Sequence, residues 1–320
     1  MRTPVFLVVS LVIAAAVFAI AVSTGNDYVF FAGYVVMQYV VLSTAWNILG
    51  GYCGYVNFGS AAFFALGAYS SVTIYKLITD SGFYRMPIPV LMLVGGAVSG
   101  AVGFGMGYLT LRLRGAFFAI ATLALAVVLQ TLVVNWDYVG GSRGAYIVRP
   151  EEIYPIGNYI RYLFLIMMLL AVGAITIARL IERSRLGYGF ATIRDDELAA
   201  EASGVPTLRL KLLATTLSGA FMGMAGAPLP YYVTYLDPTS GFSLAYAVNG
   251  VAMPLVGGTS SWLGPLIGAV LLGTLQQVAT VTISSALNLL IVGLMLVGFV
   301  IVAPNGILGL IRFRSSRGRK

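Results

Sequence analysis

The chain has 320 residues, of which 59% are hydrophobic and only 9% are charged, whereas an average soluble domain has about 25% charged residues. This composition excludes an ordinary soluble globular protein and predicts an all-α integral membrane protein. The formal net charge is +8, but the basic residues lie between apolar runs and at the C-terminus. Positive-inside topology explains that distribution, so we expect no nucleic-acid partner.

The titratable residues restrict the chemistry further. The chain contains a single cysteine, Cys53, and no histidine. An internal disulfide, a histidine ligand and a histidine acid or base are therefore excluded. A membrane-embedded enzyme would need converging titratable groups or a cluster of metal ligands, and the sequence offers neither. We expect no catalytic residue, no metal site and no cofactor.

Apolar runs predict about ten transmembrane helices in one domain that covers residues 1–320. The expected spans are 5–22, 28–46, 55–75, 88–110, 116–134, 160–180, 210–233, 243–257, 263–282 and 287–303. The second and eighth run into glycine-rich sequence, so eight or nine full crossings are the alternative. The first run also resembles a signal peptide after Arg2, but we favour an uncleaved span because the run is long enough to cross a bilayer.

The positions of the basic residues predict the orientation. With the N-terminus in the cytoplasm, 14 of the 19 basic residues fall in cytoplasmic gaps and 5 in outer gaps. The outer set is Lys76, Arg85, Arg143, Arg149 and Arg161. This asymmetry is what the positive-inside rule requires, so both termini are expected to be cytoplasmic. The same topology predicts a cytoplasmic loop over 182–209 and an external loop over 135–159, whose aromatic residues suit either an interfacial belt or a docking surface for a soluble protein.

The cytoplasmic interval from Arg185 to Lys211 is the longest polar stretch between apolar runs. Carboxylates there are expected in the first turn of a helix, where they complement the helix dipole, with Thr192 and Asp195 forming a capping box. Gly204 is expected in a left-handed conformation that ends the helix. We therefore predict one helix of about three turns over 193–203. An ordinary solvated connecting loop is the alternative.

Two glycine-rich junctions interrupt the apolar pattern. The first junction covers Asn47 to Gly59, and the second covers Asn249 to Ala269 with Pro254 inside it. Paired interrupted segments in a transporter indicate the translocation path, because freed backbone groups are tolerated where they line a cavity. Close helix packing through small residues is the alternative. The candidate path residues are Asn47, Gly51, Asn57, Gly59, Asn249, Gly257 and Gly258.

The chain carries no energy source of its own. By the spans above, no charged residue lies near the middle of a span, whereas ion-coupled carriers usually keep such groups in the membrane. None of the three lysines, Lys76, Lys211 and Lys320, follows a glycine, so a Walker A motif is absent. These features favour a permease driven by separate ATPases. A passive channel or facilitator for a small neutral solute is the alternative from another class.

Four stretches, in order, resemble one transporter family. They are NILGGYCGYVNFGSAAFFALGAYSS, LRLRGAFFAIATLALA, GYGFATIRDDELAAEASGVPTLRLK and VGGTSSWLGPLIGA. Together they are similar to the permeases of branched-chain amino acid ABC transporters, in particular the LivM-type subunit. The third stretch resembles the family's segment that touches the ATPase, which implies ATPase-coupling positions at Gly187, Arg194, Asp195, Asp196, Glu197, Ala200 and Gly204.

The resemblance also implies a function and partners. The expected function is import of branched-chain or other hydrophobic amino acids across the bacterial inner membrane. The expected partners are a second homologous permease subunit, two ABC ATPase subunits, a periplasmic or extracellular substrate-binding protein, and membrane lipid. Urea and short-chain amide importers have related permeases, so they are the alternative within the class.

Overall fold

The computed structural model describes residues 3–81, 86–110, 113, 115–148, 157–282, 293–294, 297–298 and 306–309. In chain order its long helices are α1 (Thr3–Ser23), α2 (Asp27–Asn47), α3 (Ser60–Ser81), α4 (Ile88–Thr110), α5 (Ala116–Val134), α6 (Tyr159–Glu182), α7 (Arg185–Asp195), α9 (Thr207–Gly226), α12 (Leu244–Gly257) and α13 (Leu263–Thr282). The short elements are the π-helix η1 (Ile48–Tyr52), the 3₁₀ turns η2 (Asp137–Val139) and η3 (Gly141–Arg143), α8 (Glu197–Ala202), α10 (Leu229–Val233), α11 (Pro238–Gly241), and the strands β1 (Ala145–Tyr146) and β2 (Tyr235–Leu236).

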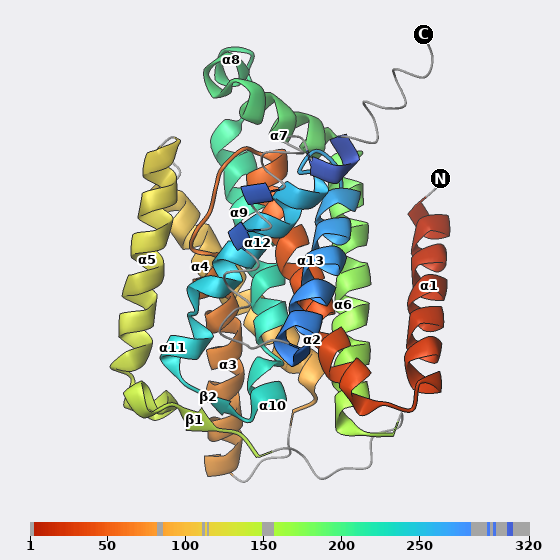
Figure 1. Cartoon of the computed structure of the whole chain (residues 1–320). Helices are drawn as coiled ribbons and strands as arrows, with labels where there is room; N and C mark the ends of the chain where they lie inside the picture. Colours follow the sequence, from red (N-terminus) through yellow and green to blue (C-terminus); the bar gives the residue numbers. More distant parts are fainter. Residues whose placement is uncertain are drawn as a thin grey trace.

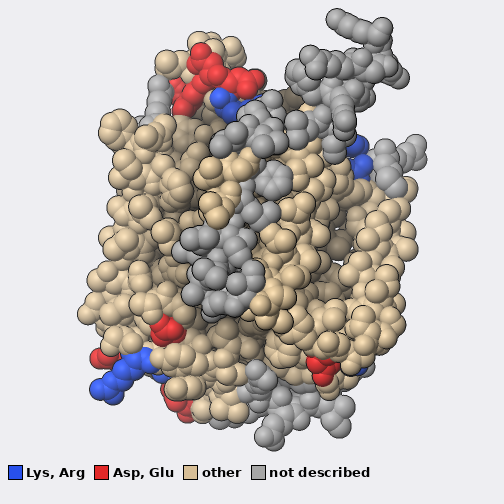
Figure 2. All heavy atoms as spheres, in the orientation of Figure 1, with Lys and Arg blue, Asp and Glu red and all other residues tan. Residues whose placement is uncertain are grey.

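The long helices stand side by side, and the connections gather at two ends of the bundle (Figure 1). One end carries α7 and α8 and is called the α8 end below. The other carries the antiparallel pair β1 and β2, in which Ala145 lies opposite Leu236, and is called the β1 end. On the face drawn in Figure 2, acidic and basic side chains lie at these two ends and an uncharged band separates them. A bilayer would occupy that band.

Eight helical segments of the described chain are long and apolar enough to cross a membrane. They are Thr3–Ser23, Asp27–Tyr52, Ser60–Ser81, Ile88–Thr110, Ala116–Val134, Tyr159–Glu182, Thr207–Val233 and Leu263–Thr282. The all-helical fold class and eight of the ten expected spans are thus confirmed, including the uncertain second one. The third begins later than expected, because residues 55–59 are not helical and α3 starts at Ser60. The expected tenth span, 287–303, lies outside the described residues except for 293–294 and 297–298.

The expected eighth span is not a continuous membrane helix. α12 has 14 residues, which at 1.5 Å per residue gives about 21 Å, less than the roughly 30 Å of a bilayer core. Nevertheless β2 pairs with β1 at one end, and Trp262 donates a hydrogen bond to Glu182 at the other. The chain between them therefore crosses the molecule through α11 and α12, with one break at Phe242 between the two helices and another at Gly258, where α12 ends.

Small residues bring α3, α4 and α9 into close contact. Ser99 on α4 donates its hydroxyl to the Phe63 carbonyl of α3 at 2.9 Å. A Cβ added to Gly223 of α9 would overlap Ser99, and one added to Gly67 of α3 would overlap the Gly223 backbone. Helices that approach this closely gain van der Waals contact, which is the main attraction between helices in lipid. These three helices form a compact centre.

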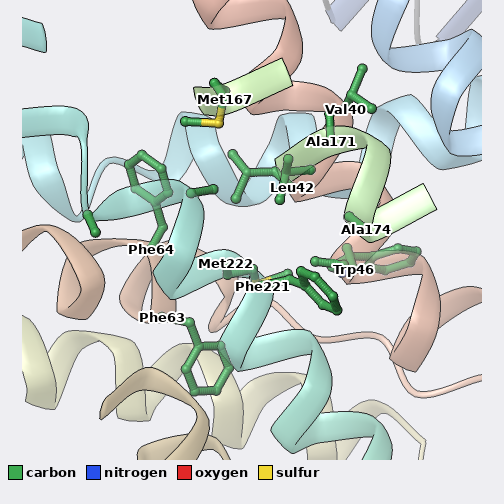
Figure 3. Close-up of a cluster of buried hydrophobic side chains, with 14 of the residues drawn as sticks. Val40, Leu42, Trp46, Phe63, Phe64, Met167, Ala171, Ala174, Phe221 and Met222 are labelled. Atoms are coloured by element: carbon green, nitrogen blue, oxygen red, sulfur yellow. The ribbon is translucent and has the colours of Figure 1, made fainter. Parts of the chain in front are cut away.

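Larger side chains fill the space beside that centre (Figure 3). α2 contributes Val40, Leu42 and Trp46, and α6 contributes Met167, Ala171 and Ala174. They pack with buried aromatic residues of α3 and α9, including Phe63, Phe64 and Phe221. By contrast, α1 and α5 leave most of their apolar side chains exposed, as expected for helices at the lipid boundary.

Candidate functional site: the α8 end and its two junctions

The cytoplasmic interval folds as two helices with a sharp corner, not as one helix over 193–203. α7 is capped by Ser184, whose hydroxyl accepts from the Leu186 amide, and it ends at Asp195. Asp196 is extended, with φ −160° and ψ 108°, and its carboxylate accepts from the Leu198 and Ala199 amides. Asp196 is therefore the cap of α8.

The predicted capping box of Thr192 and Asp195 was wrong because both residues belong to α7, before the corner at Asp196. Thr192 is inside α7 and donates its hydroxyl to the Gly189 carbonyl, and Asp195 lies in the last turn of that helix. Aspartate caps a helix at least as well as threonine does, and the cap of α8 is Asp196, four residues after Thr192. The predicted end near Ser203 was correct, because α8 ends at Ala202 with Ser203 as its C-cap, and Gly204 has φ +81°. The amides of Gly204 and Val205 bond back to Glu201 and Ala200, which completes a Schellman motif.

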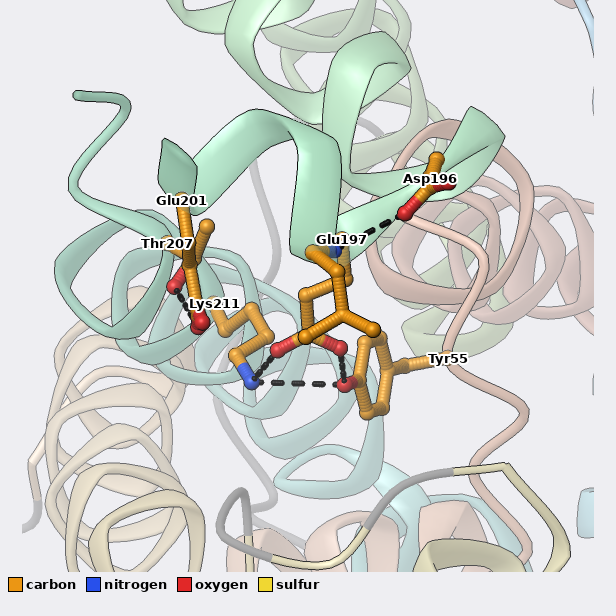
Figure 4. Close-up of polar contacts among 7 residues, drawn as sticks. Tyr55, Asp196, Glu197, Glu201, Thr207 and Lys211 are labelled. Atoms are coloured by element: carbon orange, nitrogen blue, oxygen red, sulfur yellow. Dashed lines mark hydrogen bonds and ion pairs between the residues drawn. The ribbon is translucent and has the colours of Figure 1, made fainter. Parts of the chain in front are cut away.

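Glu197 points inward from the first turn of α8 (Figure 4). Its Oε1 lies 2.6 Å from Nζ of Lys211, which is in the second turn of α9. Its other carboxylate oxygen accepts a hydrogen bond from the hydroxyl of Tyr55, and Lys211 also donates to that hydroxyl at 3.3 Å. The side chains of Lys211 and Glu197 are only 4% and 12% exposed. This cluster, which we call the Glu197 triad, joins α8, α9 and the connection between α2 and α3.

Other expected coupling residues pack α7 and α8 against the bundle. Arg194 donates to the Gly51 carbonyl at 3.3 Å and lies against Gly54, whose φ is +82°. A side chain at Gly187 would overlap the carbonyl of Ile181 at the end of α6, and Ala200 is the buried residue of α8. Asp195 and Asp196 remain exposed. The predicted coupling residues therefore form two groups. Gly187, Arg194 and Ala200 contact the bundle, whereas Asp195 and Asp196 are exposed to solvent.

The two junctions meet at the α8 end. Asn47 donates its side-chain amide to the Thr259 carbonyl at 3.1 Å, which joins the first junction to the second. A Cβ on Gly51 would also touch Thr259, and one on Gly257 would overlap Gly264, where α12 and α13 cross. Gly258, the C-cap residue of α12, lies against Gly306. The structure thus brings together residues that are about two hundred positions apart.

Asn57 and Gly59 hold the first junction to its neighbours. The Asn57 side chain accepts from the Gly59 amide at 2.7 Å, and its carbonyl accepts from the indole of Trp46 at 2.9 Å. Asn249 is apart from the others, in the middle of α12. It donates to the hydroxyl of Tyr39 at 3.3 Å and accepts from Gln276 at 2.9 Å, forming a polar contact among α2, α12 and α13.

A pocket of about 360 Å³ opens beside the Glu197 triad. It is lined by Cys53, Gly54, Tyr55, Val56, Gly115, Ala116, Ala119, Ile193, Arg194 and Glu197. Cys53 itself is fully buried. Burial raises the pKa of its thiol to about 12, and nearby Lys211 and Glu197 have opposing smaller effects on that pKa. The thiol is therefore protonated and unreactive at neutral pH.

The sequence did not single out Tyr55 or Lys211. Lys211 was assigned to the cytoplasmic gap as one more basic residue, and Tyr55 was placed in a span. A lysine within the first turns of an apolar helix was the available signal, because a buried ammonium requires a partner. Within the described ranges, no group of three or more His, Cys, Asp or Glu residues could hold a metal ion.

The structure is a bundle of apolar spans. A capped helix lies outside the bundle, and two interrupted segments meet next to that helix. These features are those of a multi-pass membrane transport protein. Residues 28–300 match the model of the family described as branched-chain amino acid transport system / permease component, and the chain belongs to that family. It is accordingly a transporter subunit, and in this family the ATPase is a separate subunit.

Curated relatives carry related names. The chain is 27% identical to the high-affinity branched-chain amino acid transport system permease protein LivM of Salmonella typhimurium, over 97% of this chain and 76% of the relative. It is 24% identical to the LivH permease protein of the same system and organism, over 85% of this chain and 91% of the relative. It is also 25% identical to the L-arabinose ABC transporter permease protein AraH of Azospirillum brasilense, over 66% and 61%. No solved structure matches.

Proposed function

We propose that the chain is the membrane-spanning permease subunit of an ATP-binding-cassette importer and that α8 is its contact with an ATPase subunit. The single observation that carries this proposal is the construction of α8. The helix is capped at both ends, lies beyond the spans and is anchored by the buried Glu197 triad, while its outer residue Leu198 is 63% exposed. In this proposal the exposed face of α8, which carries Leu198, meets the ATPase, and the triad holds that face in place.

The distribution of charge supports a cytoplasmic position for the α8 end. Six described basic residues lie there and three lie toward the β1 end. The former are Arg179, Arg183, Arg185, Arg194, Arg209 and Lys211, and the latter are Lys76, Arg143 and Arg161. The positive-inside rule then orients the α8 end toward the cytoplasm, where ATP is available. The first turn of α1 and the described turn 306–309 lie at the same end, in agreement with cytoplasmic termini in a bacterial inner membrane.

The expected partners complete the importer. LivM and LivH are two different permease proteins of one named system in one organism, and this chain resembles both, which supports pairing with a second homologous permease. Two ATPases would contact the α8 ends of that pair. The external surface around η2, η3 and β1 faces the opposite side, where a substrate-binding protein would dock. The exposed apolar residues of α1 and α5 suit contact with lipid.

The proposed substrate is a branched-chain or other hydrophobic amino acid, as for the LivM relatives. The translocation path is proposed to pass the polar contact around Asn249 and to end at the meeting point of the two junctions. Interrupted helices at that point leave backbone groups free to rearrange, as expected of a gate. The arabinose permease among the relatives makes the identity of the solute an experimental question.

The test is solute uptake by the assembled complex in proteoliposomes. Labelled leucine, phenylalanine, urea and L-arabinose are supplied in turn with the cognate binding protein, with or without ATP on the ATPase side. We expect ATP-dependent accumulation of leucine or phenylalanine. Equilibration of a solute without ATP would mean a facilitator, and accumulation of urea or arabinose alone would reassign the substrate.

A pair of matched variants tests the role of α8 in the same vesicles. Leu198→Asp places a carboxylate on the exposed face of α8, and Tyr146→Asp makes the same change at a residue that is 76% exposed at the β1 end. We expect Leu198→Asp to weaken retention of the ATPase subunit and Tyr146→Asp to retain it. Equal retention in both variants would contradict the proposed contact.

A further inference from the structure

The Glu197 triad buries two opposite charges between α8 and α9. The carboxylate and the ammonium are 2.6 Å apart and almost wholly removed from solvent. Replacing such a pair by apolar side chains is often neutral or stabilising, so a buried pair is weak grounds for assuming a purely structural role. Charged pairs of this kind instead fix one arrangement of the elements that carry them.

The triad fixes α8 to the first junction and not merely to its own neighbour along the chain. Tyr55 comes from the connection after η1, about 140 residues before Glu197. A second contact supports the same attachment, since Arg194 donates to the Gly51 carbonyl within η1 and packs on Gly54. Two independent contacts therefore hold the corner between α7 and α8 on the segment from Gly51 to Tyr55.

That segment is in turn attached to the second junction. Asn47, the residue before η1, donates to the Thr259 carbonyl, and the amide of Trp262 donates to Glu182 at the end of α6. A π-helix such as η1 is rare and often occurs at functional sites. The contacts thus run without interruption from α8 through η1 to the turn between α12 and α13.

We propose that the Glu197 triad is a latch that makes the first junction move with α8, so that a displacement of α8 by the ATPase reaches both junctions. Glu197, Lys211 and Tyr55 are positioning residues in this proposal, and none of them touches the solute or ATP. The inference rests on the proposed function, because the ATPase supplies the displacement. It reassigns Glu197 from direct contact with the ATPase to the attachment of the helix that makes the contact.

Cys53 reports on the latch directly. It is the only cysteine in the sequence, it is buried, and it lines the pocket beside Tyr55 and Glu197. If α8 separates from the first junction, the thiol becomes accessible to a maleimide. The complex is assembled in nanodiscs, and modification of the Cys53 peptide is followed by mass spectrometry without nucleotide and with ATP plus vanadate.

The expected result separates a latch from a merely stabilising contact. In the wild-type complex the labelling rate of Cys53 depends on nucleotide. In Glu197→Gln and Lys211→Met the rate rises on the order of tenfold and no longer depends on nucleotide, within the range of ordinary coupling between sites. Lys211→Arg preserves the charge and retains the dependence. Tyr55→Phe removes the hydroxyl that bonds both Glu197 and Lys211 but keeps the ring, so it serves if the charge variants fail to fold.

Glu201→Gln is the matched control. Glu201 is one turn further along α8 and accepts from Thr207, at the start of α9, at 2.8 Å, and this contact joins α8 to α9. We expect this variant to label as the wild type does. Nucleotide-dependent labelling that persists in Glu197→Gln, Lys211→Met and Tyr55→Phe would overturn the latch.

Uptake measured on the same preparations keeps the two proposals apart. A wild-type complex that shows no ATP-dependent uptake would refute the proposed function. A wild-type complex that transports, with latch variants that transport equally well per ATP hydrolysed, would refute the latch alone. The latch predicts variants that hydrolyse ATP but lose on the order of tenfold in uptake per ATP.

Discussion

The structural role of Lys211 depends on the residues that it contacts. In the sequence it is one of 19 basic residues at the edge of an apolar run. In the structure its ammonium lies over the ring of Tyr55 at 4.9 Å and is paired with Glu197, while its side chain is almost completely buried. A charge in that position requires a partner, because an isolated buried ion costs several kcal/mol.

This burial predicts a characteristic pattern of stability. Lys211→Met leaves the Glu197 carboxylate without its lysine, and breaking a buried pair typically costs about 3–5 kcal/mol. Adding Glu197→Leu removes the second charge and should recover most of that loss. Thermal unfolding of the purified chain in detergent measures both. A double variant as unstable as Lys211→Met would show that packing of the lysine stem matters more than charge.

At the scale of elements, the close contact among α3, α4 and α9 depends on the absence of side chains. Gly223 lies against Ser99 and the carbonyl of Gly95, both on α4. Because α9 begins directly after α8 and carries Lys211, this contact also fixes the platform on which α8 rests. The packing of the spans and the position of the candidate ATPase contact are therefore linked.

Alanine substitutions should separate packing from helix propensity. Gly223→Ala introduces a methyl group into a filled contact and should destabilise the chain by about 1–3 kcal/mol. Gly105→Ala, on the exposed side of α4, meets nothing within 4 Å. It should be neutral or stabilising by up to about 1 kcal/mol, since alanine favours helix. Melting temperatures of both variants in detergent provide the comparison, and equal shifts would contradict the close contact.

For the whole molecule, the segregation of charge to two ends defines how it sits in a bilayer. The β1 end, with Tyr146, and the α8 end, with Ala202, are separated by the uncharged band of Figure 2. The proposed orientation assigns the first to the outside and the second to the cytoplasm.

Labelling of engineered cysteines in intact cells tests that orientation. In a Cys53→Ser background, the Tyr146→Cys variant should react with a membrane-impermeant maleimide in intact cells. The Ala202→Cys variant should react only after the membrane is permeabilised, because the proposed orientation places the α8 end in the cytoplasm. The reverse pattern would contradict the orientation, and labelling of both in intact cells would contradict the assignment of the two ends to opposite sides.

The sequence by itself determined eight of the membrane spans. α5 begins and ends at the predicted residues, and α4 and α13 begin at theirs, because hydrophobic runs and their interruptions are local properties of the chain. The glycine-rich motifs and the polar interval were likewise sufficient to indicate a permease of this family. The end of α8 at Gly204 was predictable for the same reason, since a left-handed cap requires a particular residue type at one position.

Only the tertiary structure decided what those segments do together. The corner at Asp196, the inward direction of Glu197 and the contact of Asn47 with Thr259 all depend on which elements lie against each other. The broken crossing through α11 and α12 likewise becomes evident only when both of its ends are placed. Propensity and hydropathy describe neighbours along the chain, whereas buried charges and free backbone groups are satisfied by partners far away in sequence.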